Sequence, residues 1–540
     1  MPFNQQLDQV VQAQIAENRK KIKSIIKTVI LCGQNNIPLR GKRDDSPDNE
    51  LLQGNFQSLL EFRMDSGDEI LKKHFETAPR NATYRSKTIQ NQIINTVGNH
   101  IISKIAREVN ESKMFSVMAD ESADISNKEN LALVIRFIDS EQNVREEFVG
   151  LRECGEDLSG ESIKNVIITS INDMGLSMDC CRGQAYDGAG SMAGKYVGAS
   201  TLIQNQFNKA IYIHCMNHRL NLCVANTCSL QLVKNMMSTV RKLSEFFDNS
   251  PKRQHRLSSK VPELLPRANH TTLVNVCRTR WIERIDGLDR IAELLLPVCE
   301  TLEDIKLNRG DRGIAGEGKW NRQSQDDAAN LFNAINFQFI VTLVIVKYIL
   351  NLTRPATVKL QSKEMDLLST EQEISSLRKA LENMQANIDH HHQTLYQEAV
   401  SLAADVGIEP SQPRIVQRQI HRSSCPASTP LDYYRINLTR VFLDHSLSQL
   451  QSRFPPQAYT CYKGFSIVPA LMLRKVATWK TDVQAFTDVY MQDIPNPAGL
   501  SAELFLWERL WTEKRERSED IPDKIATTLK IVHCESFPKY

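Results

Sequence analysis

Two stretches decide the fold: FSVMADESAD at residues 115–124 and CRGQAYDGAGSMAG at residues 181–194. Each begins with a short run of strand-like composition and leads into an aspartate, Asp120 in the first and Asp187 in the second. A glycine-rich turn and the start of a helix follow Asp187. Working outward from these stretches, we predict further strands at the positions where similar short runs recur: residues 132–138, 148–151 and 211–214.

Apolar residues at helical spacing occupy the segments between these strands. They predict helices over residues 93–109, 162–174 and 220–225. The resulting order is three strands, a helix, a strand, a helix and a strand. This is the order expected of an RNase H-like core, although periodicity alone indicates only the α/β class.

The pattern becomes almost entirely helical after Trp281. A heptad-like seam indicates one helix packed inside a bundle or, alternatively, a dimeric coiled coil. Three consecutive histidines on this helix, 390–392, are expected to lie on a solvated face and not to form a metal site, because adjacent residues point in different directions. The seam consists of Ile374, Leu377, Leu381, Met384, Ile388 and Leu395.

The chain's length also bears on its organisation. A chain of 540 residues exceeds what one hydrophobic core usually serves, so at least two structural units are expected. We predict a polar helical and linker segment, the first part of an RNase H-like domain, a helical insertion domain, and the start of a truncated C-terminal region. Their boundaries are 1–88, 89–300, 301–515 and 516–540.

Composition restricts the kinds of partner. A hydrophobic fraction of 41% and a charged fraction of 24% are typical of soluble globular proteins. The net charge is only +2, so no overall basic field indicates a nucleic-acid partner. Any binding to DNA is therefore expected to come from local patches.

Cysteine usage and hydropathy bear on the compartment. Twelve cysteines are scattered without a regular framework, which favours the nucleus or the cytosol. The first 21 residues contain no apolar core of a secretory signal. The most apolar run, residues 337–350, is too short to span a bilayer and is predicted to be a buried helix, so no membrane partner is expected.

The two aspartates could carry chemistry. Carboxylates at the ends of neighbouring strands suit Mg²⁺ or Mn²⁺, and two such ions roughly 4 Å apart can activate the attacking oxygen and stabilise the leaving one. Asp120 and Asp187 are therefore candidate metal ligands and catalytic residues, with Asp124 as a substitute for Asp120. Strand-end aspartates are also common turn and cap residues.

A third stretch, IHCMNHRLNLC at residues 213–223, combines histidine and cysteine. The spacing of His214, Cys215, His218 and Cys223 suggests zinc, but no clean second pair is present elsewhere. A structural role, with side chains packed where a strand meets a helix, is the other interpretation.

A fourth stretch, RTRW at residues 278–281, places Arg278 and Arg280 beside Trp281. A tryptophan can stack on an unpaired base while arginines contact phosphates, or it can anchor a core. Upstream, Lys252, Arg253 and Arg256 could follow a phosphate backbone or form a solvated surface.

Taken together and in this order, these stretches resemble the hAT (hobo/Ac/Tam3) superfamily of transposase-like proteins. The branch is the one related to zinc finger MYM-type proteins and THAP-domain repressors. The resemblance runs from about residue 90 to the last residue. It is carried by 119–129, 183–194, 215–222 and 278–281, and further along by RPATVKLQ (354–361), 399–414, 418–422 and LDYYRINL (431–438).

The resemblance implies an RNase H-like catalytic core interrupted by a large all-helical insertion. It also implies metal-dependent phosphoryl transfer on DNA, in which Asp120 and Asp187 match the first two of three acidic ligands for Mg²⁺ or Mn²⁺. Cys215 and His218 match a structural C-x-x-H element. Trp281 matches a tryptophan associated with a flipped base, with Arg280 on phosphate.

The third acidic residue of the family has no match here. Glu508 and the terminal Cys534–Phe537 string do not fit its motif, so we expect a catalytically incomplete, DNA-associated nuclear protein with doubtful dimerisation. Two alternatives stay open. The chain is a fragment of an active cut-and-paste transposase, or a domesticated regulator that binds proteins through its helical region.

Overall fold

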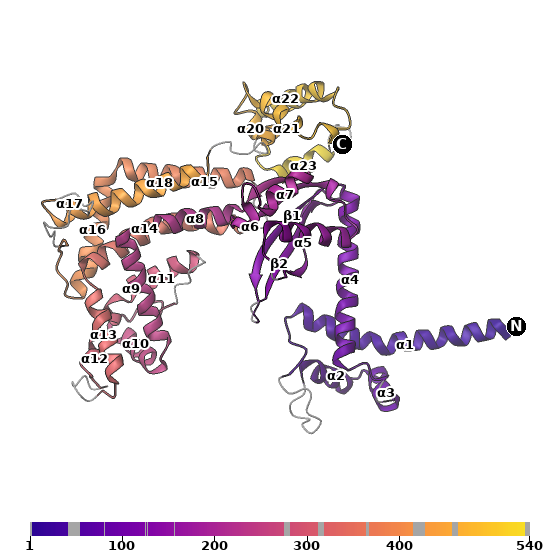
Figure 1. The fold of residues 1–540 in the computed structure, drawn as a ribbon, viewed down its shortest axis with the longest axis horizontal. Helices are drawn as coiled ribbons and strands as arrows, with labels where there is room; N and C mark the ends of the chain where they lie inside the picture. The colour runs from indigo at the N-terminus through magenta and orange to yellow at the C-terminus, as the bar shows by residue number, and fades with distance from the viewer. Residues whose placement is uncertain are drawn as a thin grey trace. The chain divides into compact units, whose positions relative to one another are not determined.

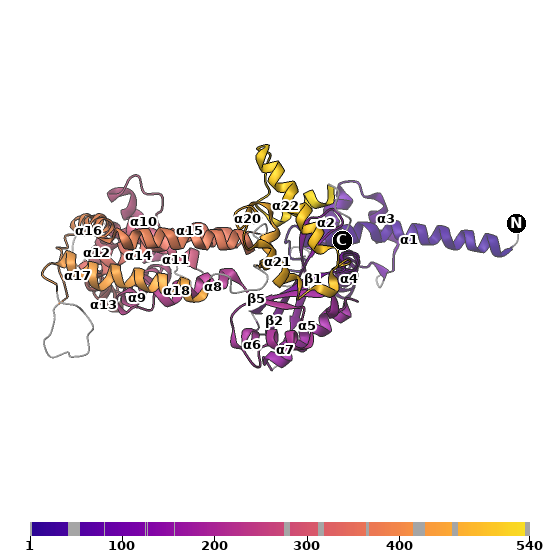
Figure 2. The same ribbon diagram turned by 90° about the horizontal axis from the view of Figure 1, so that it is seen from above.

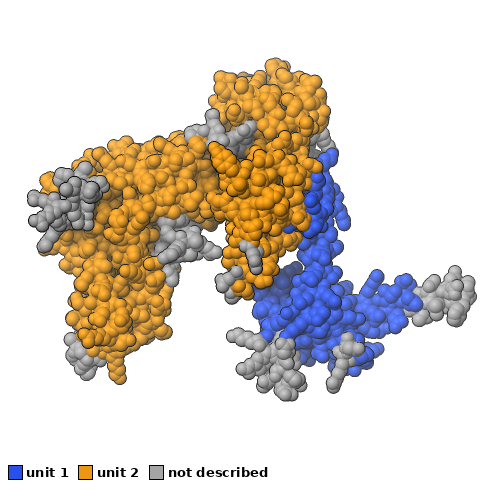
Figure 3. Space-filling model, in the orientation of Figure 1, with its two compact units in different colours: residues 1–113, 170–177 blue, residues 114–169, 178–540 orange. Residues whose placement is uncertain are grey.

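The computed structural model describes residues 3–41, 54–79, 82–124, 126, 128–155, 157–274, 281–310, 318–362, 367–413, 427–455 and 463–534. It divides into two compact units (Figure 3). One comprises residues 1–113 and 170–177, and the other comprises residues 114–169 and 178–540.

Four helices build most of the first unit. Leu60 and Leu71 come from the segment that the sequence predicted to be a linker, yet both are buried in a small core with Ile25, Phe56 and Ile93. Over these residues the chain forms two short helices that pack against α1 and against each other. The helices are α1 (Phe3–Gln34), α2 (Asn55–Asp65), α3 (Glu69–Thr77) and α4 (Lys87–Ser112).

A five-stranded mixed sheet lies at the start of the second unit (Figure 1), in the order β3-β2-β1-β4-β5. The first three strands pair antiparallel, and β4 and β5 pair parallel to β1 and to each other. The carboxyl ends of β1, β4 and β5 therefore meet at one edge of the sheet. The strands are β1 (Phe115–Ala123), β2 (Glu129–Ile138), β3 (Val144–Glu153), β4 (Cys181–Tyr186) and β5 (Ile211–His214).

Alternating burial explains why these segments form strands. Val117, Leu133 and Ile135 are fully buried on one face, whereas their neighbours in sequence are half-buried. The α/β class and the predicted order of strands and helices are confirmed. The first three strands are longer than predicted, so Asp120 lies within β1 rather than at its end.

Helices alternate with the parallel strands. In α5, Ile163 and Ile167 are buried. Between β4 and β5, Gln184 donates hydrogen bonds from its buried amide to the carbonyls of Ser200 and Ala210, both at 2.9 Å, which ties β4 to α7. The elements here are α5 (Gly160–Asp173), η3 (Met178–Cys180), α6 (Gly190–Ala193), α7 (Ala199–Gln206) and α8 (Met216–Thr227).

The described elements after β5 are all helices, and those from α8 to α18 share one large core. The long helices α8, α14, α15 and α18 run side by side (Figures 1 and 2). The elements are α9 (Gln231–Asp248), α10 (Pro251–Leu264), α11 (Trp281–Glu293), α12 (Leu295–Lys306), α13 (Arg322–Ala334), α14 (Phe337–Leu360), α15 (Leu367–Ala386), α16 (Ile388–Asp405), α17 (Pro430–Tyr434), η4 (Arg435–Arg440) and α18 (Val441–Arg453).

Helix α14 contains the most apolar run of the sequence. It is 24 residues long, and among the described helices it alone has the length and composition to cross a membrane. However, 67% of its most apolar window is buried inside the helical core. The prediction of a buried helix is therefore confirmed, although the helix is longer than the apolar run that predicted it.

The heptad-like seam is buried in the same core, as expected for a helix inside a bundle. It is interrupted at Asn387, where α15 ends and α16 begins. One of the three histidines departs from the prediction. His392 is buried and its ring nitrogens lie 2.8 Å from Thr439 Oγ1 and 2.9 Å from the Leu431 carbonyl, so this side chain is part of the core and not of a solvated face.

The last helices form a separate small core around Trp479, Trp507 and Trp511. Asp493 from this region is bound by two cations of the sheet, Arg182 at the start of β4 and Lys209 just before β5. The elements are η5 (Phe465–Ile467), α20 (Pro469–Met472), α21 (Trp479–Thr487), η6 (Met491–Asp493), α22 (Leu500–Glu516) and α23 (Ile525–Cys534).

Candidate functional site

The parallel pairing of β1 with β4 brings the two predicted aspartates together. Met118 pairs with Ala185 in this ladder, so continuing the register by two residues places Asp120 beside Asp187. Neighbouring strands lie about 4.8 Å apart. The pair therefore occupies the carboxyl edge of the parallel strands, where α/β sheets commonly bind their ligands.

Asp187 is held by its own turn. Its Oδ1 accepts a hydrogen bond from the Ala189 amide at 3.1 Å. Its backbone carbonyl accepts another from the Tyr212 hydroxyl of β5 at 3.0 Å. These bonds fix the turn after β4.

Asp120 is exposed on β1, opposite Ala132 of β2. The protein around its carboxyl group removes part of its hydration, and the negative charge of Asp187 adds to this effect, so that the pKa of Asp120 is raised above its usual value. His218 opposes the shift. Two carboxylates that repel each other favour the binding of a cation between them.

Glu121 is a third carboxylate near the pair that the sequence analysis did not single out. Partial burial raises its pKa, and Asp187 and Asp120 contribute in the same direction. Its Oε1 accepts a hydrogen bond from Ser191 Oγ of α6 at 3.3 Å. Because successive side chains of a strand point to opposite faces, Glu121 contacts α6 while Asp120 faces away from it.

Two histidines border the carboxylates. Burial of His214 at the end of β5 lowers its pKa to about 4, with Arg219 and His218 adding positive charge. The rings of His214 and His218 lie 5.5 Å apart between centroids. Among the described residues, Nε2 of His214 is one of the buried polar atoms with no hydrogen-bond partner.

The glycine after Asp187 makes room for this ring. A Cβ atom on Gly188 would lie 2.5 Å from Cε1 of His214, closer than any real contact. Gly188 thus lets the histidine pack directly under the turn that carries Asp187. The glycine-rich sequence here allows this close approach.

Cys215 and His218 lie where β5 meets α8, the position expected for a structural element. The Cys215 amide donates to the Tyr186 carbonyl at 2.8 Å, but the Cys215 side chain is exposed instead of packed. Cys223 is buried, and its thiol lies 3.4 Å from the Gln449 carbonyl. Within the described ranges, no three or more His, Cys, Asp or Glu side chains are grouped as a metal centre.

Asp124 has a different task from Asp120. Its Oδ1 accepts hydrogen bonds from the amides of Ser126 at 2.8 Å and Lys128 at 2.9 Å. It therefore shapes the turn between β1 and β2. Of the two aspartates considered for the first position, Asp120 is the one adjacent to Asp187.

The predicted nucleic-acid contacts fall largely outside what is described. Arg278 and Arg280 lie outside the described residues, and Trp281 begins α11 but its side chain is not described. The upstream cations are engaged within the protein: Arg256 pairs with Asp304 at 2.8 Å, while Arg253 and Lys252 lie over aromatic rings. These bonds favour a structural role for the cations of α10 over contact with phosphates.

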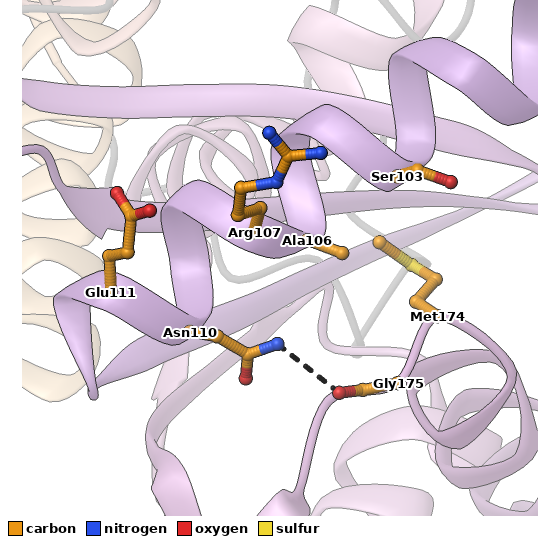
Figure 4. A pocket seen from close by; sticks show the side chains of 7 residues that line it. All are labelled: Ser103, Ala106, Arg107, Asn110, Glu111, Met174 and Gly175. Atoms are coloured by element: carbon orange, nitrogen blue, oxygen red, sulfur yellow. Dashed lines mark hydrogen bonds between the residues drawn. The ribbon is translucent and has the colours of Figure 1, made fainter.

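An open hollow in the first unit is a separate feature (Figure 4). It is lined mainly by α4, with Arg107 and Glu111 as its charged residues. The amide of Asn110 closes one side by donating to the Gly175 carbonyl at 3.3 Å. Its two charged side chains lie on one helix and are opposite in sign, so this hollow lacks the converging carboxylates of the sheet edge.

Comparison with known proteins identifies the family. The family model DUF4371, described as "ZMYM1/FAM200, RNase-like domain", matches residues 2–198 and so includes both aspartates. The "52 kDa repressor of the inhibitor of the protein kinase" of Homo sapiens is 30% identical over 527 residues, which cover 97% of this chain and 68% of the relative. The chain belongs to this repressor's family. The Mus musculus protein of the same name matches with the same identity and coverage.

This member of the repressor family thus carries an RNase-like domain, and both Asp120 and Asp187 lie inside it. Sequence reasoning missed Glu121, Ser191 and His214 as parts of the same edge. Of these three residues, only Glu121 could have been predicted from the sequence to belong to this edge, since it is next to Asp120. The other two are placed there by the pairing of β4 and β5 and by the turn between β4 and α6.

Proposed function

We propose that this protein is derived from a hAT-type transposase and acts in the nucleus as a DNA-associated regulator. In this proposal its RNase H-like core is interrupted by the helical region, and Asp120 and Asp187 bind Mg²⁺ or Mn²⁺. The observation that carries the proposal is the parallel register that sets the two carboxylates side by side.

The donor set fits a hard divalent cation. Mg²⁺ keeps several waters and is often bound by only one or two carboxylates, so two aspartates suffice. The cation would supply positive charge at which a phosphate oxygen can bind. Of the protein's own groups, the Ala189 amide orients Asp187 and Ser191 holds Glu121, so two of the three carboxylates are positioned in advance.

Binding, and not cutting, is the activity we propose. The relatives are named as a repressor, which is a regulatory role, and this supports a protein that occupies DNA or a partner. The carboxylate pair favours a second candidate, metal-dependent DNA cleavage of the transposase kind. The large helical core supports a third, a scaffold for other proteins.

One set of measurements separates these functions. Calorimetry with Mn²⁺ should show binding to the wild type and loss of binding in Asp187→Asn, whereas Asp173→Asn, an exposed aspartate at the end of α5, should bind like the wild type. If Asp187→Asn binds Mn²⁺ as tightly as the wild type, the metal does not bind at the assigned site.

DNA association is tested separately. Salt-sensitive binding without cleavage supports the proposal, and Arg280→Ala and Trp281→Ala should weaken it. Metal-dependent nicking of hairpin or flanked DNA that Asp187→Asn abolishes would show the enzyme instead. If neither binding nor nicking is seen and a partner protein is recovered, the scaffold function replaces both.

A further inference from the structure

A tight loop, residues 194–198, joins α6 to α7 (Figure 2) and follows the carboxylate site directly along the chain. Its middle residues, Lys195, Tyr196 and Val197, are called the 195–197 tip. Tyr196 is 76% exposed and Val197 is 72% exposed, the highest values among the described large apolar side chains. Single exposed apolar residues are common, but here two follow each other on one loop.

The base of the loop is held rigidly by close backbone contacts. The Gly198 amide and Thr201 Oγ1 both donate to the Gly194 carbonyl at 3.0 Å. A Cβ atom on Gly198 would lie 2.2 Å from the Gly194 nitrogen, and one on Gly160 would lie 2.0 Å from the Val197 carbonyl oxygen. Only glycine fits at these positions, so the backbone presents the tip in one place and little ordering entropy is lost when it binds.

The tip lies on the Glu121 side of β1. It starts two residues after α6, the short helix whose Ser191 hydrogen-bonds Glu121. Glu121 is the neighbour of Asp120 on β1, although the two side chains point to opposite faces of the strand. A strand of nucleic acid bound at the tip would therefore pass the Glu121 face of this edge of the sheet.

The chemistry of the tip suits an unpaired nucleotide. An aromatic face can stack on any base, and a nearby cation can bind the adjoining phosphate. Lys195 Nζ lies 5.4 Å from the centre of the Tyr196 ring, so the aromatic face and the charge are presented together. In a duplex the base faces are covered by their neighbours, so only an unpaired base offers a surface to the ring.

We propose that the 195–197 tip binds single-stranded or locally unpaired DNA, with Tyr196 stacked on a base and Lys195 at the neighbouring phosphate. The inference rests on the proposed DNA association and specifies which form of DNA this edge of the sheet selects.

The test uses the full chain and measures fluorescence anisotropy with a labelled single strand of mixed sequence and with the blunt duplex of the same sequence. Tyr196→Ala should weaken single-strand binding by about 5- to 100-fold, the loss expected for one stacked base, and leave duplex binding unchanged. Tyr196→Trp should retain single-strand binding, and Tyr196→Leu should lose it. Lys195→Gln should reduce the slope of log affinity against log salt by roughly 0.7.

Phe62→Ala, at another exposed aromatic, is the matched control and should bind both probes like the wild type. Unchanged melting curves show that the variants fold. If the wild type binds DNA and Tyr196→Ala binds the single strand equally well, the tip is not a DNA contact, and the proposed DNA association stands without it. If Tyr196→Leu binds the single strand like the wild type, residue 196 gives only apolar contact and the proposed stacking on a base is wrong. If the wild type binds neither probe, the proposed function fails and this inference fails with it.

Discussion

Charged side chains near the two ends of β4 are arranged differently: opposite charges pair near its start, and like charges adjoin after its end. Near its start, Arg182 and Lys209 converge on Asp493, with nitrogen to oxygen distances of 2.7 to 2.9 Å. Burial alone would raise the pKa of Asp493, but the hydrogen bonds from both cations bring it below the usual value. After its end, Asp187 and Asp120 lie side by side, and the pKa of Asp120 is raised, first by partial burial of its carboxyl group and then by the charge of Asp187.

The two ends of β4 show the difference between charges that stabilise the fold and charges that can bind a ligand. At the first end the carboxylate is 13% exposed and fully compensated, so its interactions hold the C-terminal helices to the sheet. At the other end the like charges repel each other, which costs stability unless something positive binds. The ion pairs near the start of β4 therefore stabilise the fold, and the like charges after its end favour a bound ligand. Substitutions at each end test these two roles.

The largest effect is expected at the compensated end. Asp493→Ala leaves Arg182 and Lys209 mostly buried without their carboxylate. The free energy of unfolding should fall by about 2–3 kcal/mol, somewhat less than for fully buried pairs because the three side chains keep some contact with solvent. Urea unfolding followed by tryptophan fluorescence measures this, since the C-terminal core contains three tryptophans.

Asp520→Ala, at an exposed aspartate of the same region, is the control and should change little. The effect should also depend on pH. Because the folded-state pKa of Asp493 is lowered, its stabilisation is present above the unfolded value of 3.8 and is lost as the pH falls through the folded value. Equal stability of the Asp493 and Asp520 variants at neutral pH would show that the cluster does not hold the two parts together.

The second effect concerns the loop beside the uncompensated end. Gly160→Ala forces a Cβ atom against the Val197 carbonyl, which is backbone and cannot swing away. We expect a loss of about 1–2 kcal/mol in unfolding free energy from overpacking, together with faster amide hydrogen exchange in residues 194–198. Gly155→Ala, where a Cβ atom meets no atom within 4 Å, is the control. Unchanged exchange in Gly160→Ala would mean that the loop is not held by this contact.

These contacts differ in how far the sequence could reveal them. Asp120 and Asp187 were predicted because each follows a local strand pattern, and parallel pairing then brings them together. The bond between Arg182 and Asp493 joins residues 311 positions apart and leaves no local signal. The exposure of Tyr196 was equally hidden, since it depends on how the loop between α6 and α7 is placed and not on the local sequence. The helical region was predicted from periodicity, but the burial of His392 depends on Thr439, which only tertiary packing places nearby.

A third, smaller effect comes from His214 at the open end. Its pKa is lowered to about 4 from 6.5, so the folded protein keeps the ring neutral where the unfolded chain would bind a proton. Stability should therefore decline as the pH falls from about 6.5 toward 4, by roughly 1 kcal/mol at pH 5 once partial exposure is allowed for. His214→Gln should flatten this part of the curve of melting temperature against pH, and His390→Gln should not. An identical decline in both variants would show that other groups cause it.

The smallest expected effect is the change in unfolding free energy on substituting Asp120, and its sign should depend on whether a divalent metal is bound. Without divalent ions, Asp120→Asn removes one of two repelling charges and should raise the unfolding free energy by about 0.2–1 kcal/mol. With excess Mn²⁺ the wild type gains stability from the bound ion, whereas the variant has lost a ligand and gains little, so their order reverses. Melting curves in chelator and in Mn²⁺ measure both states of both proteins. Asp124→Ala is the comparison at a carboxylate with another role. That side chain shapes the β1–β2 turn, so the loss of its two backbone hydrogen bonds should lower stability under both conditions. If the wild type and Asp120→Asn keep the same order of stability with and without Mn²⁺, a metal does not balance the charge at this end of β4. The contrast between the two ends must then have another cause.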